Sequence, residues 1–154
     1  IRIPFIARWP GKIEADTTSN HVSAFWDILP TLCEIAGAEV PPETDGLSLA
    51  PTLLGRPDRQ QQHEYLYWEF YERGGTCAVR MGEWKAVGKL LPGSTLELYH
   101  LPTDIGEQRN VAGEHPEIVA RALAAMKDAH TPSPMWKVRG RRGAKTKKSV
   151  KKKK

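Results

Sequence analysis

The order of apolar and polar positions divides the chain into two unlike parts, and the first part predicts one strand and one helix. Residues 2–10 are mostly apolar, with prolines near both ends, as in a short buried strand. A helix is predicted next, with Asp27 as its cap, Pro30 in its first turn and Gly37 at its end. Its apolar face would consist of Ile28, Leu29, Leu32, Ile35 and Ala36.

The second part changes to the two-residue period of strands. Four short runs follow one another, at residues 65–71, 77–81, 84–87 and 96–99. Tight, glycine-containing connections separate them, which predicts an antiparallel sheet. A second helix is predicted from Pro116 to His130, and its apolar stripe should pack across one face of that sheet. The stripe consists of Ile118, Val119, Ala122, Leu123 and Met126.

These patterns predict an α/β fragment followed by an α+β unit. Residues 1–58 have the pattern of the closing strand and helix of an α/β domain. Residues 59–136 predict a four-stranded antiparallel sheet packed with a C-terminal helix, and residues 137–154 predict a disordered basic tail. The first residue is Ile rather than Met, and residues 1–9 already have the pattern of a strand interior. We therefore expect this chain to be the C-terminal piece of a larger protein.

The charge of the chain is concentrated in that tail. Eleven of the 23 Lys and Arg residues lie between residues 137 and 154, where there is no acid, so residues 1–136 hold 12 basic and 18 acidic residues. An acidic body thus carries a basic extension. This extension is either a solvated, disordered segment or a segment that binds a polyanion through charge attraction. No motif that binds nucleic acid accompanies the tail, so a nucleic-acid module is not expected. No apolar run reaches the length of a membrane span.

Motifs of catalysis or metal binding are absent from the sequence. The five histidines have no metal-ligand spacing, and Asp45 and Asp104 have the settings of turn residues. We predict that Cys33 and Cys77 are free buried thiols, and a disulfide between them stays open as the alternative. An aromatic group could line a sugar platform or fill the core, and both interpretations stay open. Its members are Tyr65, Tyr67, Trp68, Phe70 and Tyr71.

Several short segments, taken in order, resemble the sulfatase family. Residues 2–12 (RIPFIARWPGK) are similar to its R-V-P-x-I-x-x-W-P-G segment, and residues 22–31 (VSAFWDILPT) to its V-S…D-L-x-P-T helix start. Residues 45–55 (DGLSLAPTLLG) resemble its D-G-x-S-L-x-P-x-L-x-G loop. Further matches follow in family order at residues 67–69 (YWE), 78–85 (AVRMGEWK), 97–99 (ELY), 104–107 (DIGE), 110 (N) and 115–117 (HPE). The type that these segments resemble is that of bacterial arylsulfatases related to N-acetylgalactosamine-6-sulfatases.

The resemblance implies an alkaline-phosphatase-like fold and a sulfuric ester hydrolase that uses calcium and a formylglycine nucleophile. Formylglycine arises in a C/S-x-P-S-R motif, which neither Cys33-Glu-Ile-Ala nor Cys77-Ala-Val-Arg fits. No catalytic or metal-binding residue can therefore be assigned here, and we expect both cofactors to belong to an upstream part of the enzyme. This chain would be inactive alone, and its partners would be that missing N-terminal part and a sulfated small molecule or glycan.

By the same resemblance, the C-terminal subdomain would border the substrate. His21, Trp68, Glu69 and Arg80 are the substrate-proximal candidates. A buried ion pair between Glu69 and Arg80, and simple packing of Trp68, are the alternatives. The family implies a periplasmic or secreted protein. The alternative function is a binding module that holds acidic or sulfated polysaccharide on its aromatic sheet and basic tail.

Overall fold

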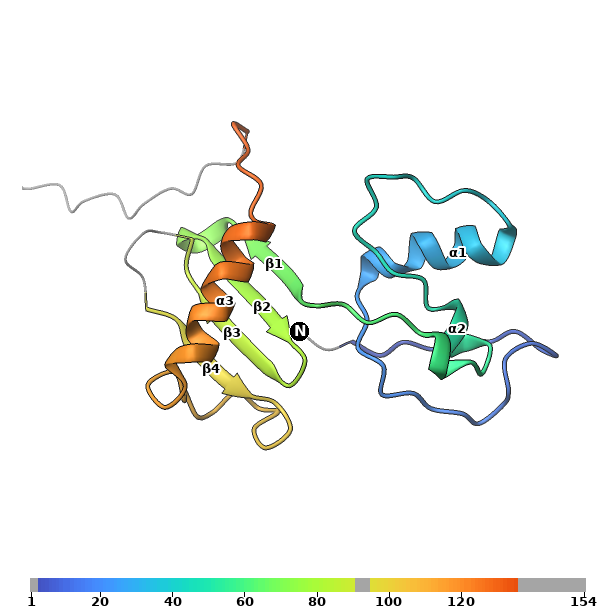
Figure 1. The fold of residues 1–154 in the computed structure, drawn as a ribbon, viewed down its shortest axis with the longest axis horizontal. Coiled ribbons are helices and arrows are strands. Elements are labelled where there is room, and N and C mark those ends of the chain that lie inside the picture. Colours follow the sequence, from blue (N-terminus) through green and yellow to red (C-terminus); the bar gives the residue numbers. More distant parts are fainter. Residues whose placement is uncertain (1–2, 91–94, 136–154) are drawn as a thin grey trace, which may run out of the picture. The chain divides into compact units, whose positions relative to one another are not determined.

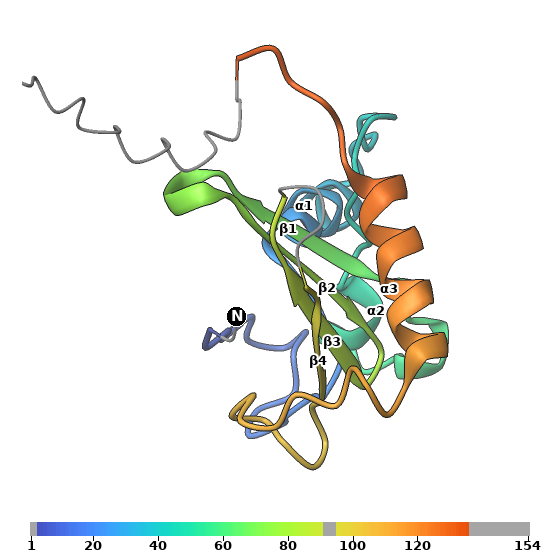
Figure 2. The same ribbon diagram turned by 90° about the vertical axis from the view of Figure 1, so that its left-hand side faces the viewer.

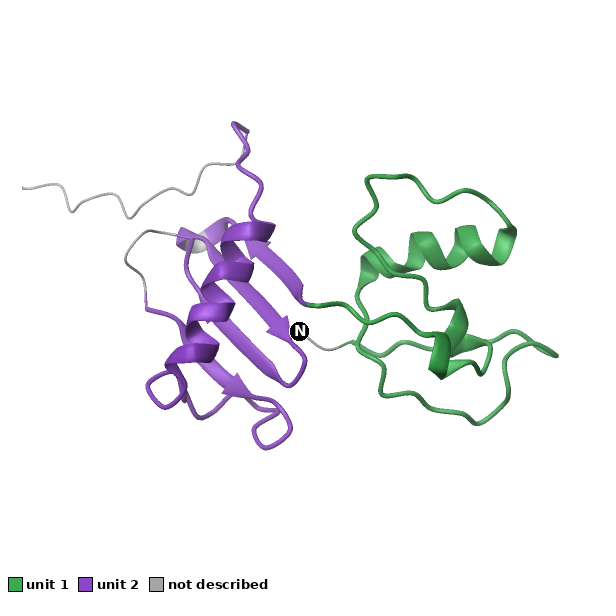
Figure 3. Cartoon of the chain, viewed as in Figure 1, with its two compact units in different colours: residues 1–64 green, residues 65–154 purple. Residues whose placement is uncertain are grey.

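The computed structural model describes residues 3–90 and 95–135 and divides the chain into two compact units. Unit 1 comprises residues 1–64 and unit 2 residues 65–154 (Figure 3). The segment that follows residue 58 belongs to unit 1 because its side chains bond back to that unit. The Gln60 side chain bonds to Thr52 and to the backbone of Ser48, and His63 bonds to Asp27.

Unit 1 is held by two helices and long loops (Figure 1). Helix α1 spans Ile28–Ala36 and follows a 3-10 turn, and a short helix α2 spans Ala50–Leu53. Gly37 ends α1 as predicted, in the left-handed conformation with φ of 69°, which glycine adopts without steric cost. Gly46 is required for another reason. A Cβ at this position would lie 2.1 Å from the backbone oxygen of Trp26, so the loop can approach the 3-10 turn before α1 this closely only with glycine.

The strand predicted at residues 2–10 is not formed in the described part of unit 1, and this prediction is wrong for residues 3–10. Ile3, Phe5 and Ile6 are 61%, 55% and 90% exposed. A strand requires a neighbouring strand to bond its backbone groups, and none of the described residues of unit 1 forms one.

The predicted apolar face of α1 is also only partly correct. Leu29 and Leu32 are exposed, whereas Pro30 and Thr31 are buried. The buried side of α1 faces the chain around residue 49, because the Thr31 hydroxyl accepts a hydrogen bond from the Leu49 amide at 2.8 Å. A polar contact therefore selects which side of the helix is covered within unit 1.

Unit 2 confirms the predicted antiparallel sheet and helix. Its strands are β1 (Leu66–Phe70), β2 (Thr76–Met81), β3 (Trp84–Gly88) and β4 (Glu97–His100), in that order across the sheet. Helix α3 (Pro116–Ala129) lies across one face of the sheet (Figures 1 and 2). Val79, Ala86 and Leu98 on that face are completely buried, as is Ala122 on α3, whereas Leu123 of the predicted stripe is half exposed.

The loop between β4 and α3 covers the outer edge of the sheet. The Val111 amide donates to the Leu98 carbonyl at 2.9 Å, and the Asn110 side chain accepts from the amides of Leu98 and Ala112, each at 3.0 Å. Asp104 shapes the same loop, as predicted, by accepting hydrogen bonds from the backbone amides of Gln108 and Arg109. The outward-facing amide and carbonyl of Leu98 in β4 therefore both have partners in this loop.

Both cysteines are free thiols, as predicted. Cys77 is buried in the core of unit 2, whereas Cys33 on α1 is only partly buried.

Candidate functional site

The four candidate residues do not form one cluster. His21 belongs to unit 1, and the other three lie on β1 and β2 of unit 2. Because side chains alternate along a strand, the pairing of Leu66 with Arg80 places Trp68 and Arg80 on one face of the sheet and Glu69 on the other. The alternative considered for Glu69 and Arg80, a buried ion pair with each other, is therefore wrong. The Arg80 guanidinium instead donates to the Gly82 carbonyl at 3.1 Å.

Glu69 is the centre of a polar cluster on the face that α3 covers. Its carboxylate accepts a hydrogen bond from the Tyr67 hydroxyl at 2.6 Å and pairs with the imidazole of His130, just after α3. Burial would raise the pKa of Glu69, but hydrogen bonds from Tyr67, Tyr71 and His130 outweigh it and lower this pKa. We call these four residues the Glu69 cluster.

The charge of Glu69 also acts on its neighbours. Burial and the hydrogen bond to Glu69 raise the pKa of Tyr67, and the same hydrogen-bond partner raises the pKa of Tyr71. Burial, followed by the negative charge of Glu69, raises the pKa of the Cys77 thiol. Both phenols and this thiol are therefore neutral at neutral pH, and Cys77 lacks the thiolate form that a nucleophile requires.

The aromatic group of the second part does not form a single platform. Tyr67 and Glu69 share the α3 face, whereas Trp68 and Phe70 point to the opposite face, since strand side chains alternate. The sequence shows the alternation but not which face α3 covers. Of the two open interpretations, the single platform is therefore not formed, because the strand places these aromatic side chains on two separate faces.

A second polar cluster lies in unit 1, around Asp27. This side chain is completely buried. Asp27 is the N-cap residue of α1, as predicted, but its side chain makes no capping hydrogen bond to that helix. Its carboxylate accepts from the Ala24 amide at 2.7 Å, the Leu47 amide at 2.9 Å and the His63 imidazole at 2.8 Å. Asp27 thus connects α1 to two loops that are distant in sequence.

His21, the one candidate residue in unit 1, borders this cluster. Its Nε2 atom is buried and has no hydrogen-bond partner among the described residues. Burial lowers the pKa of His21; the charge of Asp27 opposes this effect and His63 adds to it. The sequence patterns draw attention to His21 but miss His63 and His130, because each of these histidines gains its role from a partner that is distant in the sequence.

The two clusters connect separate segments of the chain by hydrogen bonds, but neither has the parts of a hydrolytic centre. Within the described ranges, no group of three or more His, Cys, Asp or Glu side chains could hold a metal ion. Cys33 and Cys77 lie outside the motif in which formylglycine forms, and Cys33 lies within α1. The described residues therefore fit neither calcium nor a formylglycine nucleophile. Among them, no helix has the length and apolar character needed to cross a bilayer.

Comparison with known proteins gives consistent matches along the chain. Residues 1–130 match the family model "N-sulphoglucosamine sulphohydrolase, C-terminal". A Delta 4,5-hexuronate-2-O-sulfatase of Bacteroides thetaiotaomicron is 36% identical over 140 residues, and human arylsulfatase A is 34% identical over 145 residues. These matches cover 85% and 77% of this chain, but only 29% and 28% of the two relatives.

A solved structure gives the same result. It is 25% identical with a TM-score of 0.66, over 79% of this chain and 26% of the other, and it holds its substrate, D-glucosamine-2-N,6-O-disulfate. The chain thus spans less than a third of the length of these relatives, and the aligned part includes segments of both units.

Proposed function

This chain belongs to the sulfatase family, within its C-terminal region, and from that premise we propose that it is part of an enzyme that hydrolyses sulfate esters. The observation that carries the proposal is the family match over residues 1–130, which includes described segments of both units. Motifs far apart in the sequence match in one order, which a chance similarity of a small sheet would not produce. The hexuronate-2-O-sulfatase and the arylsulfatase A reported above are both named as sulfatases.

The proposed chemistry requires groups that this chain does not supply. A formylglycine nucleophile and a calcium ion are features of the family, and the described residues fit neither. We propose that both are held by another part of the same enzyme. The role of this chain is then to support that part and to border the substrate.

Exposed apolar side chains of unit 1 support the proposal that another part of the same enzyme packs against this chain. Leu29, Leu32 and Phe25 of the α1 region are 50%, 58% and 74% exposed, and Ile6 is 90% exposed. Apolar surface of this kind on one small unit usually marks a contact with other protein. We propose that the remainder of the same polypeptide covers it, and that residues 3–10 join a sheet of that remainder as an added strand.

Sulfated glycans or small sulfate esters are the proposed substrates. The names of the relatives include a hexuronate sulfatase and an arylsulfatase, and the solved relative holds a disulfated glucosamine. These differ in the leaving group, so the chain supports the class of sulfate esters rather than one compound. His21, Trp68, Glu69 and Arg80 remain proposed substrate neighbours, but the structure gives them at least two separate locations.

Trp68 offers the sharpest test among these residues. In the complete enzyme, we expect Trp68→Ala to change the ratio of kcat/KM between an aryl sulfate and a sulfated sugar by about tenfold, with little change in Tm. Phe70→Ala is the matched control, because Phe70 has the same side-chain direction at the end of β1. An equal loss of activity on both substrates, together with a lower Tm, would show that Trp68 only supports the fold.

The proposed function is tested by turnover of a chromogenic aryl sulfate in the presence of calcium. The assay compares this chain alone with the longer gene product that contains it. Turnover by the longer product alone is the expected result. Turnover by this chain alone would contradict the proposal, because a catalytic centre would then lie among its own residues. Absence of turnover from both, with aryl and sugar sulfates alike, would favour a binding module.

A further inference from the structure

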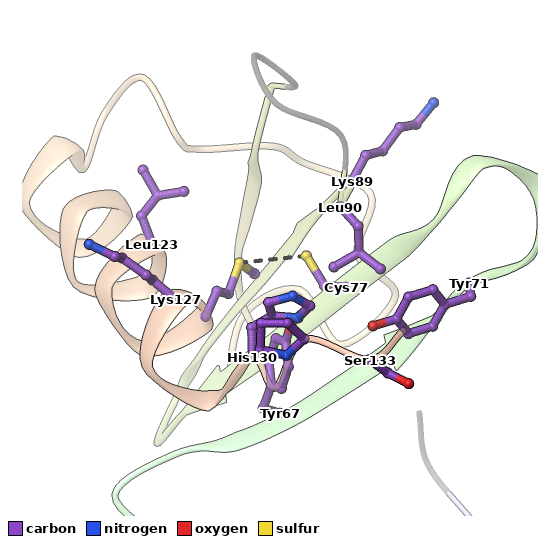
Figure 4. Close-up of a pocket in the computed structure, with 11 residues that line it drawn as sticks. Tyr67, Tyr71, Cys77, Lys89, Leu90, Leu123, Lys127, His130 and Ser133 are labelled. Carbon is purple, nitrogen blue, oxygen red and sulfur yellow. Dashed lines mark hydrogen bonds between the residues drawn. The ribbon is translucent and has the colours of Figure 1, made fainter. Parts of the chain in front are cut away.

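A pocket of about 400 Å³ lies in unit 2 between the C-terminal half of α3 and the sheet, and two sulfur atoms meet in its lining (Figure 4). The Cys77 thiol lies 3.9 Å from the thioether sulfur of Met126, along the dashed line in Figure 4, and both side chains are buried. Gly88, opposite Cys77 in β3, has no side chain to fill the space beside this thiol. A Cβ there would lie 3.8 Å from the Cys77 sulfur, an ordinary contact distance, so there is room next to the sulfur pair.

A third side chain that can bind a metal, His130, lines the same pocket. Met126 and His130 are four residues apart at the C-terminal end of α3, a spacing that places both side chains on one side of the helix. Glu69 pairs with His130 and is the cross-strand neighbour of Cys77 on the face that α3 covers. Directly opposed residues of an antiparallel pair have Cβ atoms about 5 Å apart, so the imidazole that Glu69 holds lies within reach of the Cys77 sulfur.

Glu69 also orients this imidazole in the way that metal-binding histidines usually require. Its carboxylate bonds to Nδ1 of His130, so Nε2 is the ring nitrogen that can bind an ion. A carboxylate behind a ligating histidine is a common second partner, and it fixes the direction of the ring. The Tyr67 hydroxyl donates to the same carboxylate at 2.6 Å, so the position of the carboxylate is itself fixed.

The chemistry of these donors selects the kind of ion. A thiolate, a thioether and an imidazole together favour Cu(I), whereas Mg²⁺ and Ca²⁺ require oxygen ligands. Zn²⁺ sites use Cys, His, Asp and Glu, and within residues 3–90 and 95–135 no group of three such side chains could hold an ion. Metal–sulfur bonds of about 2.3 Å place two sulfur ligands of a three-coordinate ion about 4 Å apart. The separation of the Cys77 and Met126 sulfur atoms matches this value.

We propose that Cys77, Met126 and His130 form a binding site for Cu(I) in unit 2. The ion replaces the thiol proton that lies between the two sulfur atoms. The S–H bond breaks, a copper–sulfur bond forms, the proton passes to solvent, and the copper stays Cu(I). Burial raises the pKa of the Cys77 thiol, so the ion competes with this proton and binds more tightly as the pH rises. The ion would connect β2 to the end of α3 and stabilise unit 2, and hydrolysis plays no part in the proposal.

The test is a competition titration of the 154-residue chain with Cu(I) against a chromogenic Cu(I) chelator, without oxygen and with ascorbate as reductant. The chain carries Cys33→Ser, which leaves Cys77 as the only thiol, because the sequence contains two cysteines. We expect a single equivalent of Cu(I) to bind, the NMR signal of the Met126 methyl group to shift, and the Tm of unit 2 to rise by several degrees. Zn²⁺ at the same concentration should not displace the copper, because a thioether is a poor ligand for it.

Paired variants locate the site. Met126→Leu removes the thioether at nearly constant volume, and His130→Gln removes the imidazole; each should weaken Cu(I) binding by about tenfold or more. Met81→Leu is the matched control for the first, since Met81 is buried in the same core but does not line the pocket. His115→Gln, at the opposite end of α3, is the control for the second. Both controls should keep the original affinity. Unchanged affinity in Met126→Leu or His130→Gln, or an equal loss in a control, would overturn the proposal.

Discussion

At the scale of single residues, Asp27 shows how a buried carboxylate can organise loops. A charged group is costly to bury unless hydrogen bonds and an opposite charge compensate its lost hydration. Asp27 obtains two backbone amides and the His63 imidazole as donors, all within 2.9 Å. Removal of its carboxylate would therefore leave several buried donors without an acceptor.

We predict that Asp27→Ala lowers the free energy of unfolding of unit 1 by about 3 kcal/mol, with a smaller loss for Asp27→Asn, which keeps one acceptor oxygen. Urea denaturation of the full chain measures the effect. The control is Asp45→Ala, at an exposed position in a neighbouring loop, with a change of less than about 0.5 kcal/mol. Equal stability of the Asp27 and Asp45 variants would refute the central role of Asp27.

The lowered pKa of Glu69 predicts that the stability of unit 2 decreases as the pH becomes acidic. Its folded pKa lies below the usual value of 4.5, so the folded state binds this proton less readily than the unfolded chain does. Its contribution to stability is complete above pH 4.5 and is lost as the pH falls through the folded pKa. Glu69→Gln should therefore flatten the acid side of the stability curve. Thermal unfolding from pH 7 to pH 3 measures this, and Glu72→Gln, at an exposed position, should keep the original slope.

At the scale of elements, the sheet of unit 2 follows from its sequence because each strand pairs with its neighbour along the chain. Short connections bring the partners together, and the alternation of side chains then divides them between the two faces of the sheet, although it does not specify which face α3 covers. The cover over the β4 edge is less evident. It depends on Asn110, whose single oxygen accepts from two backbone amides in different segments.

Asn110→Ala should uncover the β4 edge and destabilise unit 2 by about 1–2 kcal/mol, because two amides lose their acceptor. Hydrogen exchange of the Leu98 and Ala112 amides should become faster, and the exposed edge should promote association at high concentration. Asn110→Asp is the matched control, since it retains an acceptor oxygen. If the two variants exchange equally slowly at these amides, the side chain does not hold the loop.

At the scale of the whole molecule, the two units have very different cores. The hydrophobic cluster around Val79, Leu98 and Met126 lies entirely in unit 2. In unit 1, large apolar residues such as Phe5, Ile6 and Phe25 are exposed, and a polar residue, Asp27, is its most deeply buried large side chain. Burial of apolar surface is the main stabilising contribution to folding, so unit 2 is the more self-sufficient of the two.

We predict that residues 65–154 alone fold cooperatively, whereas residues 1–64 alone do not. Far-ultraviolet circular dichroism with thermal denaturation distinguishes the two outcomes. The separated unit 2 should keep a sigmoidal transition, and the separated unit 1 should show none. A cooperative transition of isolated unit 1 would show that its exposed apolar residues need no further partner, and it would weaken the proposal that the rest of the polypeptide covers them.

The sequence by itself determined the elements whose partners are near in the chain: the four strands, α3, and the end of α1 at Gly37. Local backbone preferences and the period of apolar residues suffice there. The resemblance to sulfatases also followed from the order of short motifs, and the family match confirms it. Only the tertiary structure decided the roles of Asp27, His63 and His130, because hydrogen bonds between distant residues leave no periodic signal. The strand predicted at residues 2–10 is not formed in residues 3–10 for a related reason. An apolar pattern specifies which side chains a strand can bury, but not whether a neighbouring strand is present to pair with its backbone.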